Sequence, residues 1–288
     1  MGSPTSSSKS WTVTVAAGNT ADAATLLAAA SGLSKRKVKE AMSKGAVWLA
    51  RDHREQRLRR ARSVPAAGAV LRLHYAPEIL ARQPPTPLLL ADREAYSVWH
   101  KPPGLLSQGN RYGDHCAIER LAAKHLDRPV FVVHRLDRET GGLILLAHQQ
   151  RAAAALGRLL RERRMEKTYL ALVCGRPQPP SGEILLSLDG KAAASRYVTV
   201  AYYAEGALLR IEIISGRTHQ VRRHLTALGH PVVGDPRYGR GNKRPGGMRL
   251  VACRLAFRCP LTHKEKTFCL PGGLTRSVLF GGTSLTPR

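Results

Sequence analysis

Short apolar runs separated by turn residues recur along the chain from Tyr96 onward, and they restrict the fold more than any other sequence feature. Such runs, rich in β-branched and aromatic side chains, indicate strands. We expect helices near residues 150–164 and 217–228. Because regular crossover helices are missing between the strands, the pattern favours an α+β fold with a mostly antiparallel mixed sheet. We expect strands at residues 130–133, 142–147, 167–173, 195–203 and 207–214.

A proline-rich segment, Pro84-Pro85-Thr86-Pro87, interrupts the chain. Proline fixes the backbone angle φ and lacks an amide proton, so this segment is poor material for a helix or a central strand and favours an extended linker. The sequence therefore predicts two domains of unequal size. The expected bounds are a disordered tail at 1–10, a small α/β domain at 11–83, a linker at 84–94 and a large domain at 95–288.

The small domain is predicted to carry a dense positive charge. We expect helices at 23–30 and 35–44, the second with Ser34 as its N-cap, and strands at 47–49 and 68–75. Residues 33–62 contain eleven Lys and Arg against three acidic residues, a net charge of +8. This density is typical of a surface that faces phosphates, although a solvated basic face is the simpler alternative.

The whole chain is strongly basic, with 46 Lys and Arg against 20 Asp and Glu and a formal net charge of +26 over 288 residues. This excess predicts a polyanionic partner, nucleic acid before an anionic membrane surface. We expect no membrane association, because no apolar run is long enough to span a bilayer. Five scattered cysteines and a tail without a secretory apolar region favour the reducing cytoplasm. We expect a monomer.

The segment His134-Arg135-Leu136-Asp137-Arg138-Glu139-Thr140-Gly141 lies between two apolar runs, so both of its ends should be anchored in the core. Arg135 and Arg138 are close to Asp137 in sequence, and neighbouring positive charge favours the ionised acid. We therefore expect Asp137 to be a carboxylate at neutral pH, able to act as nucleophile or base. A structural ion pair is the alternative interpretation.

Two further segments place chemically useful side chains near apolar runs. Tyr169 lies on the strand 167–173, where its ring could stack on a nucleobase or simply fill the core. Arg217 precedes the helix at 217–228, where its guanidinium could clamp a phosphate or pair with a carboxylate. Residues 229–239, rich in Gly and Pro, indicate a structural elbow.

Together these segments resemble the RluA-type family of RNA pseudouridine synthases, in the family's motif order. The matching motifs are Trp99-His100-Lys101-Pro102-Pro103-Gly104, His134-Arg135-Leu136-Asp137 with Thr140 and Gly142, Lys167-Thr168-Tyr169, Gly216-Arg217-Thr218-His219-Gln220-Val221-Arg222, and residues 228–239. The small domain resembles the S4 RNA-binding domain. Gly141 departs from the family, which often carries Ser or Thr there, and we expect it to loosen the loop after the aspartate.

The resemblance implies an enzyme that isomerises uridine in structured RNA to its C-glycoside with no cofactor and no metal. By motif position, Asp137 is the catalytic aspartate, Tyr169 packs on the target base and Arg217 pairs with the aspartate. Large-subunit (23S) ribosomal RNA is the preferred substrate, with transfer RNA as the alternative. The expected RNA-binding residues are Lys35, Arg36, Lys37, Lys39, Lys44, Arg135 and Arg222.

Other functions compete with this interpretation. A non-catalytic RNA-binding or ribosome-assembly protein would need the charge but not Asp137, and an RNA or DNA glycosylase would release free uracil. Structural zinc at Cys253, Cys259, His263 and Cys269 is disfavoured, because zinc sites use more closely spaced cysteine pairs.

Overall fold

The chain, described here from a computed structural model, divides into two compact units. Unit 1 comprises residues 1–84 and 108–121, and unit 2 comprises residues 85–107 and 122–288. The structure describes residues 8–281 apart from 205, 240, 243 and 245. Of the predicted disordered tail, residues 1–7 lie outside the described residues. The prediction is wrong for Lys9 and Ser10, which begin a strand because they pair with the edge of a sheet.

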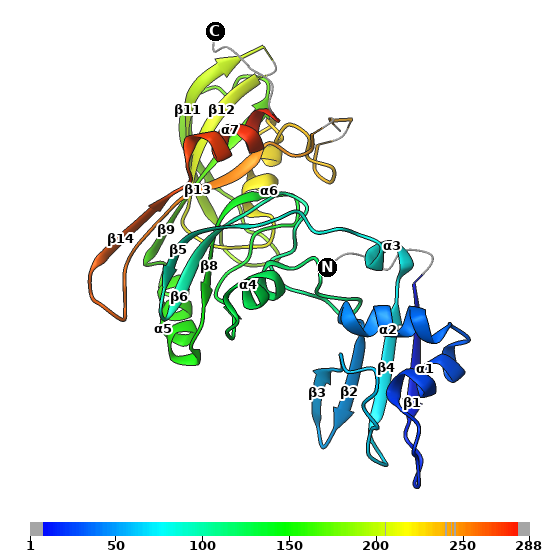
Figure 1. The fold of residues 1–288 in the computed structure, drawn as a ribbon. Helices are drawn as coiled ribbons and strands as arrows, with labels where there is room; N and C mark the ends of the chain where they lie inside the picture. The colour runs from blue at the N-terminus through cyan, green and yellow to red at the C-terminus, as the bar shows by residue number, and fades with distance from the viewer. Residues whose placement is uncertain (1–7, 205, 240, 243, 245, 282–288) are drawn as a thin grey trace. The chain divides into compact units, whose positions relative to one another are not determined.

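Unit 1 is built on a four-stranded antiparallel sheet in the order β1-β4-β2-β3. One face of this sheet packs on helices α1 and α2, and buried Leu71 and Leu73 join Leu27 and Met42 in a single core. The predicted N-cap is confirmed, since Ser34 Oγ accepts a hydrogen bond from the Lys37 amide at 3.4 Å. The elements are β1 (Lys9–Thr14), α1 (Ala23–Ser31), α2 (Lys35–Ser43), β2 (Val47–Arg51), β3 (Arg54–Arg57), β4 (Val70–Tyr75) and α3 (Pro77–Leu80) (Figure 1).

The segment 108–121 belongs to unit 1, which differs from the predicted boundary of the large domain at residue 95. Asp114 is 6% exposed and forms ion pairs with Arg57 of β3 and with Arg59, which lies in the loop after β3. Trp48 Nε1 donates to the Arg111 carbonyl at 3.1 Å. These contacts between distant segments could not be read from composition. Helix α4 (Ile118–Leu126) begins in this segment.

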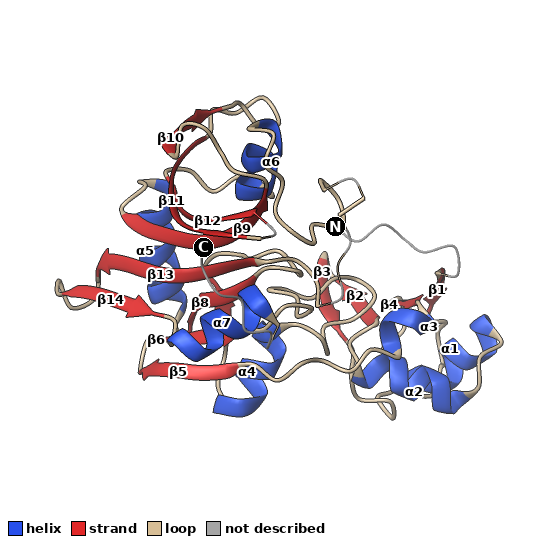
Figure 2. Cartoon of the chain, turned by 90° about the horizontal axis from the view of Figure 1, so that it is seen from above, coloured by secondary structure: helices blue, strands red, loops and turns tan. Residues whose placement is uncertain are grey.

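Unit 2 contains a large sheet whose main path runs β10-β11-β12-β9-β13-β8-β6-β5, with β14 beside β13 and β7 beside β8 (Figure 2). Among the described strands, β13 and β8 pair in parallel and the other neighbours are antiparallel. The predicted α+β class with a mostly antiparallel mixed sheet is confirmed. The elements are β5 (Leu88–Arg93), β6 (Tyr96–Lys101), β7 (Phe131–Val132), β8 (Gly141–Ala147), α5 (Gln150–Arg161), β9 (Met165–Cys174), β10 (Ser181–Leu185), β11 (Ala194–Tyr203), β12 (Gly206–Ile213), α6 (Gln220–Ala227), β13 (Leu250–Arg258), β14 (Glu265–Cys269) and α7 (Gly272–Phe280).

Two expectations about unit 2 are wrong in part. Residues 88–93 of the predicted linker form strand β5, because they pair with β6 along the edge of the sheet. The run 130–133 is not a buried strand: β7 covers two residues, and Phe131 is 38% exposed. Apolar composition alone did not distinguish a short edge strand from a central one.

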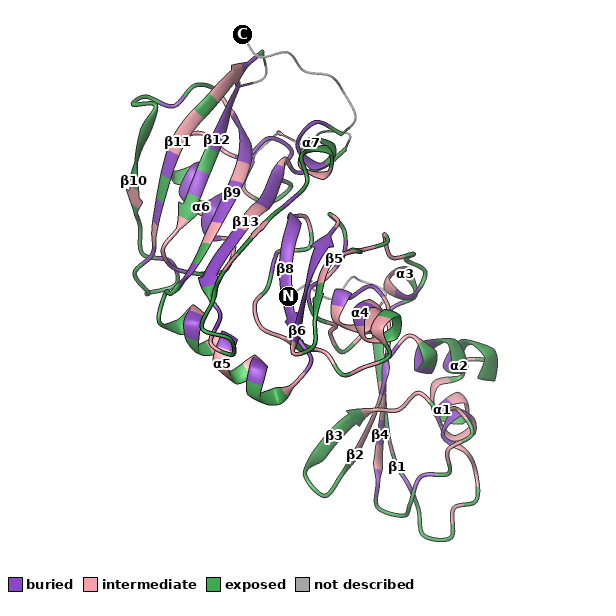
Figure 3. Cartoon of the chain, turned by 60° about the vertical axis from the view of Figure 1, so that its left-hand side comes forward, coloured by how far each residue is buried: buried purple, intermediate pink, exposed green. Residues whose placement is uncertain are grey.

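The core of unit 2 is continuous across the sheet and its helices. Strands β6 and β8 are buried along their whole length (Figure 3). Leu156 of α5 and Leu279 of α7 belong to the same apolar cluster as Leu143 and Val251 of the central strands. The loops at the ends of β6 and β8 are therefore attached to the most rigid part of the unit. No helix in the described part of the chain is long and apolar enough to cross a membrane.

Candidate active site

Asp137 lies in the connection between β7 and β8, and the protein fixes this connection through its backbone. Ser107 Oγ donates to the Leu136 carbonyl at 2.7 Å and accepts from the Leu136 amide at 2.9 Å. The Thr140 amide donates to the Asp137 carbonyl at 3.2 Å. The Asp137 side chain is 22% exposed, so its carboxylate is held on a rigid loop yet remains accessible to a ligand.

Arg222 of α6 is the cation that meets Asp137. Its Nη1 lies 3.2 Å from Asp137 Oδ2, and its side chain is only 2% exposed. Its Nε and Nη2 donate to Asp235 Oδ2 and Oδ1 at 2.7 and 2.8 Å. Burial alone would lower the pKa of Arg222, but the hydrogen bonds and charge of Asp235, with Asp137, raise it above its ordinary value. Arg222 therefore stays charged and joins two carboxylates.

Asp235, fully buried, orients this arginine. Besides the two bonds from Arg222, its Oδ1 accepts from the Arg237 and Tyr238 amides at 2.8 and 3.0 Å. Burial raises the pKa of a carboxyl, but here the bonds from Arg222 and the two amides lower it below its usual range. The predicted elbow at 229–239 thus supplies a charged site residue, which its Gly and Pro content did not indicate.

His219 and Tyr238 form the side of the site next to Asp137. His219 Nε2 lies 3.7 Å from Asp137 Oδ1, and the ring Nδ1 is 2.9 Å from the Tyr238 hydroxyl. The Arg222 guanidinium carbon lies 5.0 Å from the centre of the Tyr238 ring. Burial lowers the pKa of His219 despite the Asp137 carboxylate. His219 is therefore neutral at neutral pH and provides a hydrogen-bonding group rather than a second cation.

Tyr169 lies on β9, where it pairs with Ile211 of β12 and Ala252 of β13. The side chain is 8% exposed. Burial, followed by the charge of Asp137, raises the pKa of its hydroxyl, so the ring is a neutral phenol. The structure thus places Tyr169 within electrostatic range of Asp137.

Lys101 lies at the end of β6 and is fully buried. Its ammonium donates to the Leu105 carbonyl at 2.7 Å and to the Pro102 and Arg138 carbonyls at 3.3 Å each. Burial lowers its pKa to about 7, with Asp137 and Glu139 opposing the shift. Lys101 thereby joins the loop after β6 to the Asp137 loop. Its position in a matching motif was visible in the sequence, but this role was not.

The predicted pairing of Arg217 with Asp137 is wrong. Arg217 precedes α6, and its Nε and Nη2 approach the Ala192 carbonyl at 3.4 Å. The position that meets Asp137 is Arg222, five residues further along, because the helix turns that side chain into the site. The arginines beside Asp137 in sequence do not pair with it either: Arg138 pairs with Glu139 at 2.8 Å, and Arg135 is exposed.

Comparison of the sequence with known proteins shows which family the chain belongs to. A family model described as RNA pseudouridylate synthase matches residues 95–227. The dual-specificity RNA pseudouridine synthase RluA of Pasteurella multocida (strain Pm70) is 37% identical over 198 residues, which are 61% of this chain and 89% of that protein. The chain belongs to the RluA-type family of RNA pseudouridine synthases.

Other members match over a smaller share of their own length. The ribosomal large subunit pseudouridine synthase C of Escherichia coli (strain K12) is 36% identical over 169 residues, 53% of this chain and 53% of that one. An uncharacterized RNA pseudouridine synthase of Mycoplasma pneumoniae is 33% identical over 200 residues, 62% of this chain and 65% of that one. The chain therefore spans between about half and two thirds of these relatives.

A solved structure agrees with the fold. The human RNA pseudouridylate synthase domain containing 1 superposes with a TM-score of 0.60 and 24% identity, over 72% of this chain and 92% of that one.

The residues matched by the family model, 95–227, include Asp137, Tyr169 and Arg222. Asp235 and Tyr238 lie beyond its end, so the buried carboxylate that orients Arg222 comes from outside the matched residues.

The residues predicted to bind RNA fall into three groups. Those that the structure leaves exposed are Lys35, Arg36, Lys37, Lys39 and Arg135. Lys44 is half-buried, and its ammonium binds Glu40 Oε1 and the Leu80 carbonyl at 2.7 and 2.6 Å. The prediction is wrong for Arg222, because its guanidinium is buried between two carboxylates rather than free to meet a phosphate.

One smaller expectation, about the loop after Asp137, can be compared with the structure. Gly141 does not loosen the loop after Asp137: a Cβ there would lie 3.0 Å from a Val278 methyl group and 3.1 Å from Pro103, so the absence of a side chain permits tight packing. Among the described residues, no group of three or more His, Cys, Asp or Glu is arranged to hold a metal ion. Among the described residues, the five cysteines form no disulfide.

Proposed function

We propose that this chain isomerises uridines in structured RNA to pseudouridine, without a cofactor, and that Asp137 is the reacting carboxylate. The observation that carries the proposal is the position of Asp137, 22% exposed on a fixed loop and held 3.2 Å from a buried arginine. A purely structural ion pair would not need an accessible carboxylate. The buried ring of Tyr169 beside it offers a flat wall for a base.

The chemistry uses each of these groups. The bond between ribose C1′ and uracil N1 breaks, the uracil rotates, and C5 bonds to C1′ while N1 gains a proton and C5 loses its hydrogen to solvent. Breaking this bond creates positive charge on the ribose, which Asp137 stabilises electrostatically or traps covalently. Tyr169 packs on the base. Arg222 keeps Asp137 ionised and oriented, and the half-buried Arg217 contacts an RNA phosphate.

The target uridine must leave its stack to reach Asp137, so binding surfaces for the surrounding RNA are expected. We propose that unit 1 is an S4-like RNA-binding domain that provides one such surface with the exposed cations of α2. The net charge of +26 supports a polyanionic partner. A monomer acting in the cytoplasm fits this proposal, and cysteines that form no disulfide in the described part of the chain are compatible with a reducing compartment.

Ribosomal RNA is the proposed substrate. One relative is named for the ribosomal large subunit, and it is 36% identical over 169 residues. Transfer RNA is the alternative substrate for the same chemistry. Mapping of pseudouridines in ribosomal and transfer RNA from cells without this protein would distinguish the two, because the sites that disappear identify the substrate.

The reaction is tested by tritium release from RNA transcripts that contain 5-tritiated uridine. The proposal requires release by the wild-type protein on at least one ribosomal or transfer RNA, with loss of release in Asp137→Asn. Chromatography of the digested RNA must show a nucleoside that has the mass of uridine but elutes separately from it. Free uracil would instead identify a glycosylase, and silence on every RNA would favour a non-catalytic RNA-binding protein.

A further inference from the structure

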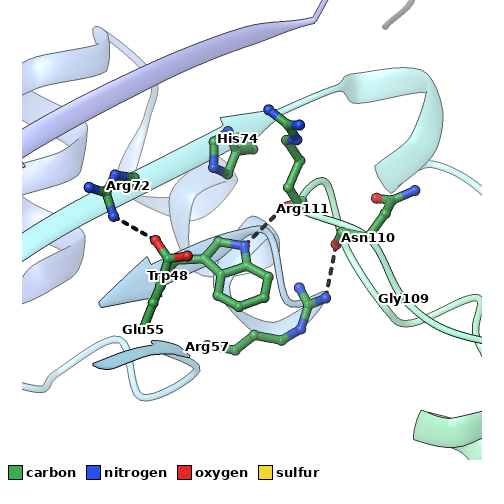
Figure 4. A pocket seen from close by; sticks show the side chains of 8 residues that line it. All are labelled: Trp48, Glu55, Arg57, Arg72, His74, Gly109, Asn110 and Arg111. Atoms are coloured by element: carbon green, nitrogen blue, oxygen red, sulfur yellow. Dashed lines mark hydrogen bonds and ion pairs between the residues drawn. The ribbon is translucent and has the colours of Figure 1, made fainter. Parts of the chain in front are cut away.

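Unit 1 contains a cavity of about 720 Å³ on the face of its sheet opposite the helices (Figure 4). The volume lies within the range of about 300–1,000 Å³ that is usual for small-ligand sites. Strands β2, β3 and β4 provide one wall, and the turn at 109–111 provides the other. The side chains and turn residues that line it are Trp48, Glu55, Arg57, Arg72, His74, Gly109, Asn110 and Arg111.

The register of the sheet explains why aromatic and basic side chains meet on this face. Trp48 of β2 is directly opposite Arg57 of β3 and Arg72 of β4. Residues that pair across neighbouring strands project to the same face, and so do residues two positions apart on one strand, which adds His74 and Glu55. The intervening apolar residues face the helices and form the core of unit 1. The core of unit 1 thus lies on the helix side of the sheet, and the aromatic and basic side chains lie on the other side.

Trp48 is held in place by polar contacts around its ring. Its Nε1 donates to the Arg111 carbonyl at 3.1 Å, and the Arg57 guanidinium carbon lies 4.2 Å from the ring centre. Arg57 is itself fixed by the Asn110 carbonyl at 2.9 Å and by Asp114 at 3.3 Å. An indole held in this way loses little conformational freedom when a ligand stacks on it, which favours binding.

The cations around the ring are not all neutralised by the protein. Arg72 pairs with Glu55 at 2.6 Å. The exposed Arg111 guanidinium has no hydrogen bond or ion pair with any residue that the structure describes. Burial, followed by the nearby Arg111 charge, lowers the pKa of His74, so its imidazole is neutral at neutral pH. The cavity thus combines an aromatic ring, a neutral hydrogen-bonding ring and an available positive charge.

We propose that this cavity binds one unpaired nucleotide of the RNA, with the base on Trp48 and a phosphate on Arg111. The assignment rests on the proposed function in that the ligand is RNA. A flat aromatic surface accepts any base, and a guanidinium neutralises the backbone. A base inside a duplex is stacked on both faces, so the cavity selects a nucleotide that is splayed out of its helix. This surface is distinct from the α2 cations, because α2 covers the opposite face of the sheet.

The test is equilibrium binding of a fluorescein-labelled pentacytidylate to the full-length protein, followed by fluorescence anisotropy. Cytidine is used because it offers no uridine to Asp137. Trp48→Ala and Arg111→Glu should each weaken binding at least about five-fold, whereas Trp48→Phe, which keeps a stacking ring, should weaken it less than Trp48→Ala. Arg82→Glu is the control, because it makes the same charge change at an exposed position of unit 1, outside the cavity and outside the basic segment 33–62. It should weaken binding less than about two-fold.

Equal weakening by Arg82→Glu and Arg111→Glu would overturn the proposal, since binding would then reflect overall charge. So would wild-type protein that fails to bind the pentanucleotide, or displacement of the pentanucleotide by pentaglutamate as effectively as by unlabelled pentacytidylate. Circular dichroism of each variant verifies that it is folded. Tritium release by the same wild-type preparation separates the two proposals: release without pentacytidylate binding overturns only the cavity, and cavity-dependent binding without release overturns only the catalytic function.

Discussion

Arg222 binds two carboxylates at once, with Nη1 at 3.2 Å from Asp137 Oδ2 and with Nε at 2.7 Å from Asp235 Oδ2. The pair with Asp235 is two-pronged and fully buried, so it fixes the plane of the guanidinium. The remaining nitrogen is thereby directed at Asp137. The position of the accessible carboxylate consequently depends on a second carboxylate that is remote from it in sequence.

Replacing Arg222 should be far more damaging than replacing Arg217. Arg222→Met leaves Asp235 buried without its cation, and we expect the free energy of unfolding to fall by about 3–5 kcal/mol. Arg217→Met should lower it by no more than about 1 kcal/mol, because that half-buried side chain loses only long contacts with a neutral backbone carbonyl. Urea unfolding followed by circular dichroism measures both. Similar losses in the two variants would contradict the assigned pairing.

Asp235→Asn should slow the reaction without weakening RNA binding. The amide keeps the size of the side chain but offers one acceptor oxygen, so it cannot accept from both Nε and Nη2 of Arg222. Arg222 then loses its fixed plane, and Asp137 loses its fixed partner. We expect kcat to fall by about ten-fold or more, with KM for the RNA transcript little changed. A rise in KM at constant kcat would instead assign Asp235 to RNA binding.

Lys101 should give the protein a distinctive dependence of stability on pH. Its pKa is about 7 in the folded protein, because of burial, against 10.5 for an ordinary lysine. Between these values the unfolded chain binds the extra proton, so this group makes the folded state more stable as pH rises from about 7 to 10.5. The slope should approach about 1.4 kcal/mol per pH unit. Below pH 7 Lys101 is protonated in both the folded and the unfolded state, so its contribution to the free energy of unfolding no longer changes with pH.

The measurement is the free energy of unfolding of wild type and Lys101→Met at several pH values from 6 to 10. The difference between the two proteins isolates Lys101, since the remaining titrating groups are common to both. The advantage of wild type over the variant should grow across this range above pH 7. A difference that stays constant would mean that Lys101 keeps an ordinary pKa.

Gly142 is required where β8 approaches β13. It has φ of 119°, and a Cβ at this position would lie 2.2 Å from the Ala252 carbonyl oxygen. A Cβ would also lie 2.5 Å from the Ala252 amide nitrogen, and this backbone cannot move away. Gly142→Ala should therefore destabilise the protein by about 3 kcal/mol or more and displace the Asp137 loop. Gly272→Ala is the matched control, because it meets no atom within 4 Å and has no positive φ. Thermal unfolding followed by circular dichroism measures both variants. Gly272→Ala should lower the free energy of unfolding by less than about 1 kcal/mol.

The sheet of unit 2 was largely predictable from sequence because its strands are apolar runs bounded by turns. The buried run 142–147 became β8, and 207–214 became β12 with nearly the same bounds. The edge strands were not predictable in this way. Residues 88–93 alternate weakly and follow three prolines, so their pairing with β6 depends on tertiary contacts rather than on local pattern.

The candidate site was predictable only in part, and the reason is geometric. Asp137 and Tyr169 lie on or beside strands, where the alternation of faces is easily read. Arg217 lies in the loop before α6 and Arg222 lies in the first turn of that helix, so no shared periodicity relates the directions of the two side chains. Which of them meets Asp137 depends on how α6 packs. Asp235 was missed because nothing local distinguishes a buried carboxylate in a turn from a solvated one.

The central claim, that Asp137 carries the reaction, is tested most directly by tritium release from 5-tritiated uridine in ribosomal RNA transcripts. Wild type, Asp137→Asn and Glu139→Gln should be compared at saturating enzyme. Both substitutions turn a carboxylate near Arg222 into an amide, since Glu139 lies 4.0 Å from Arg222 Nη1. The account predicts release by wild type and by Glu139→Gln, and none above background by Asp137→Asn. Undiminished release by Asp137→Asn would contradict it.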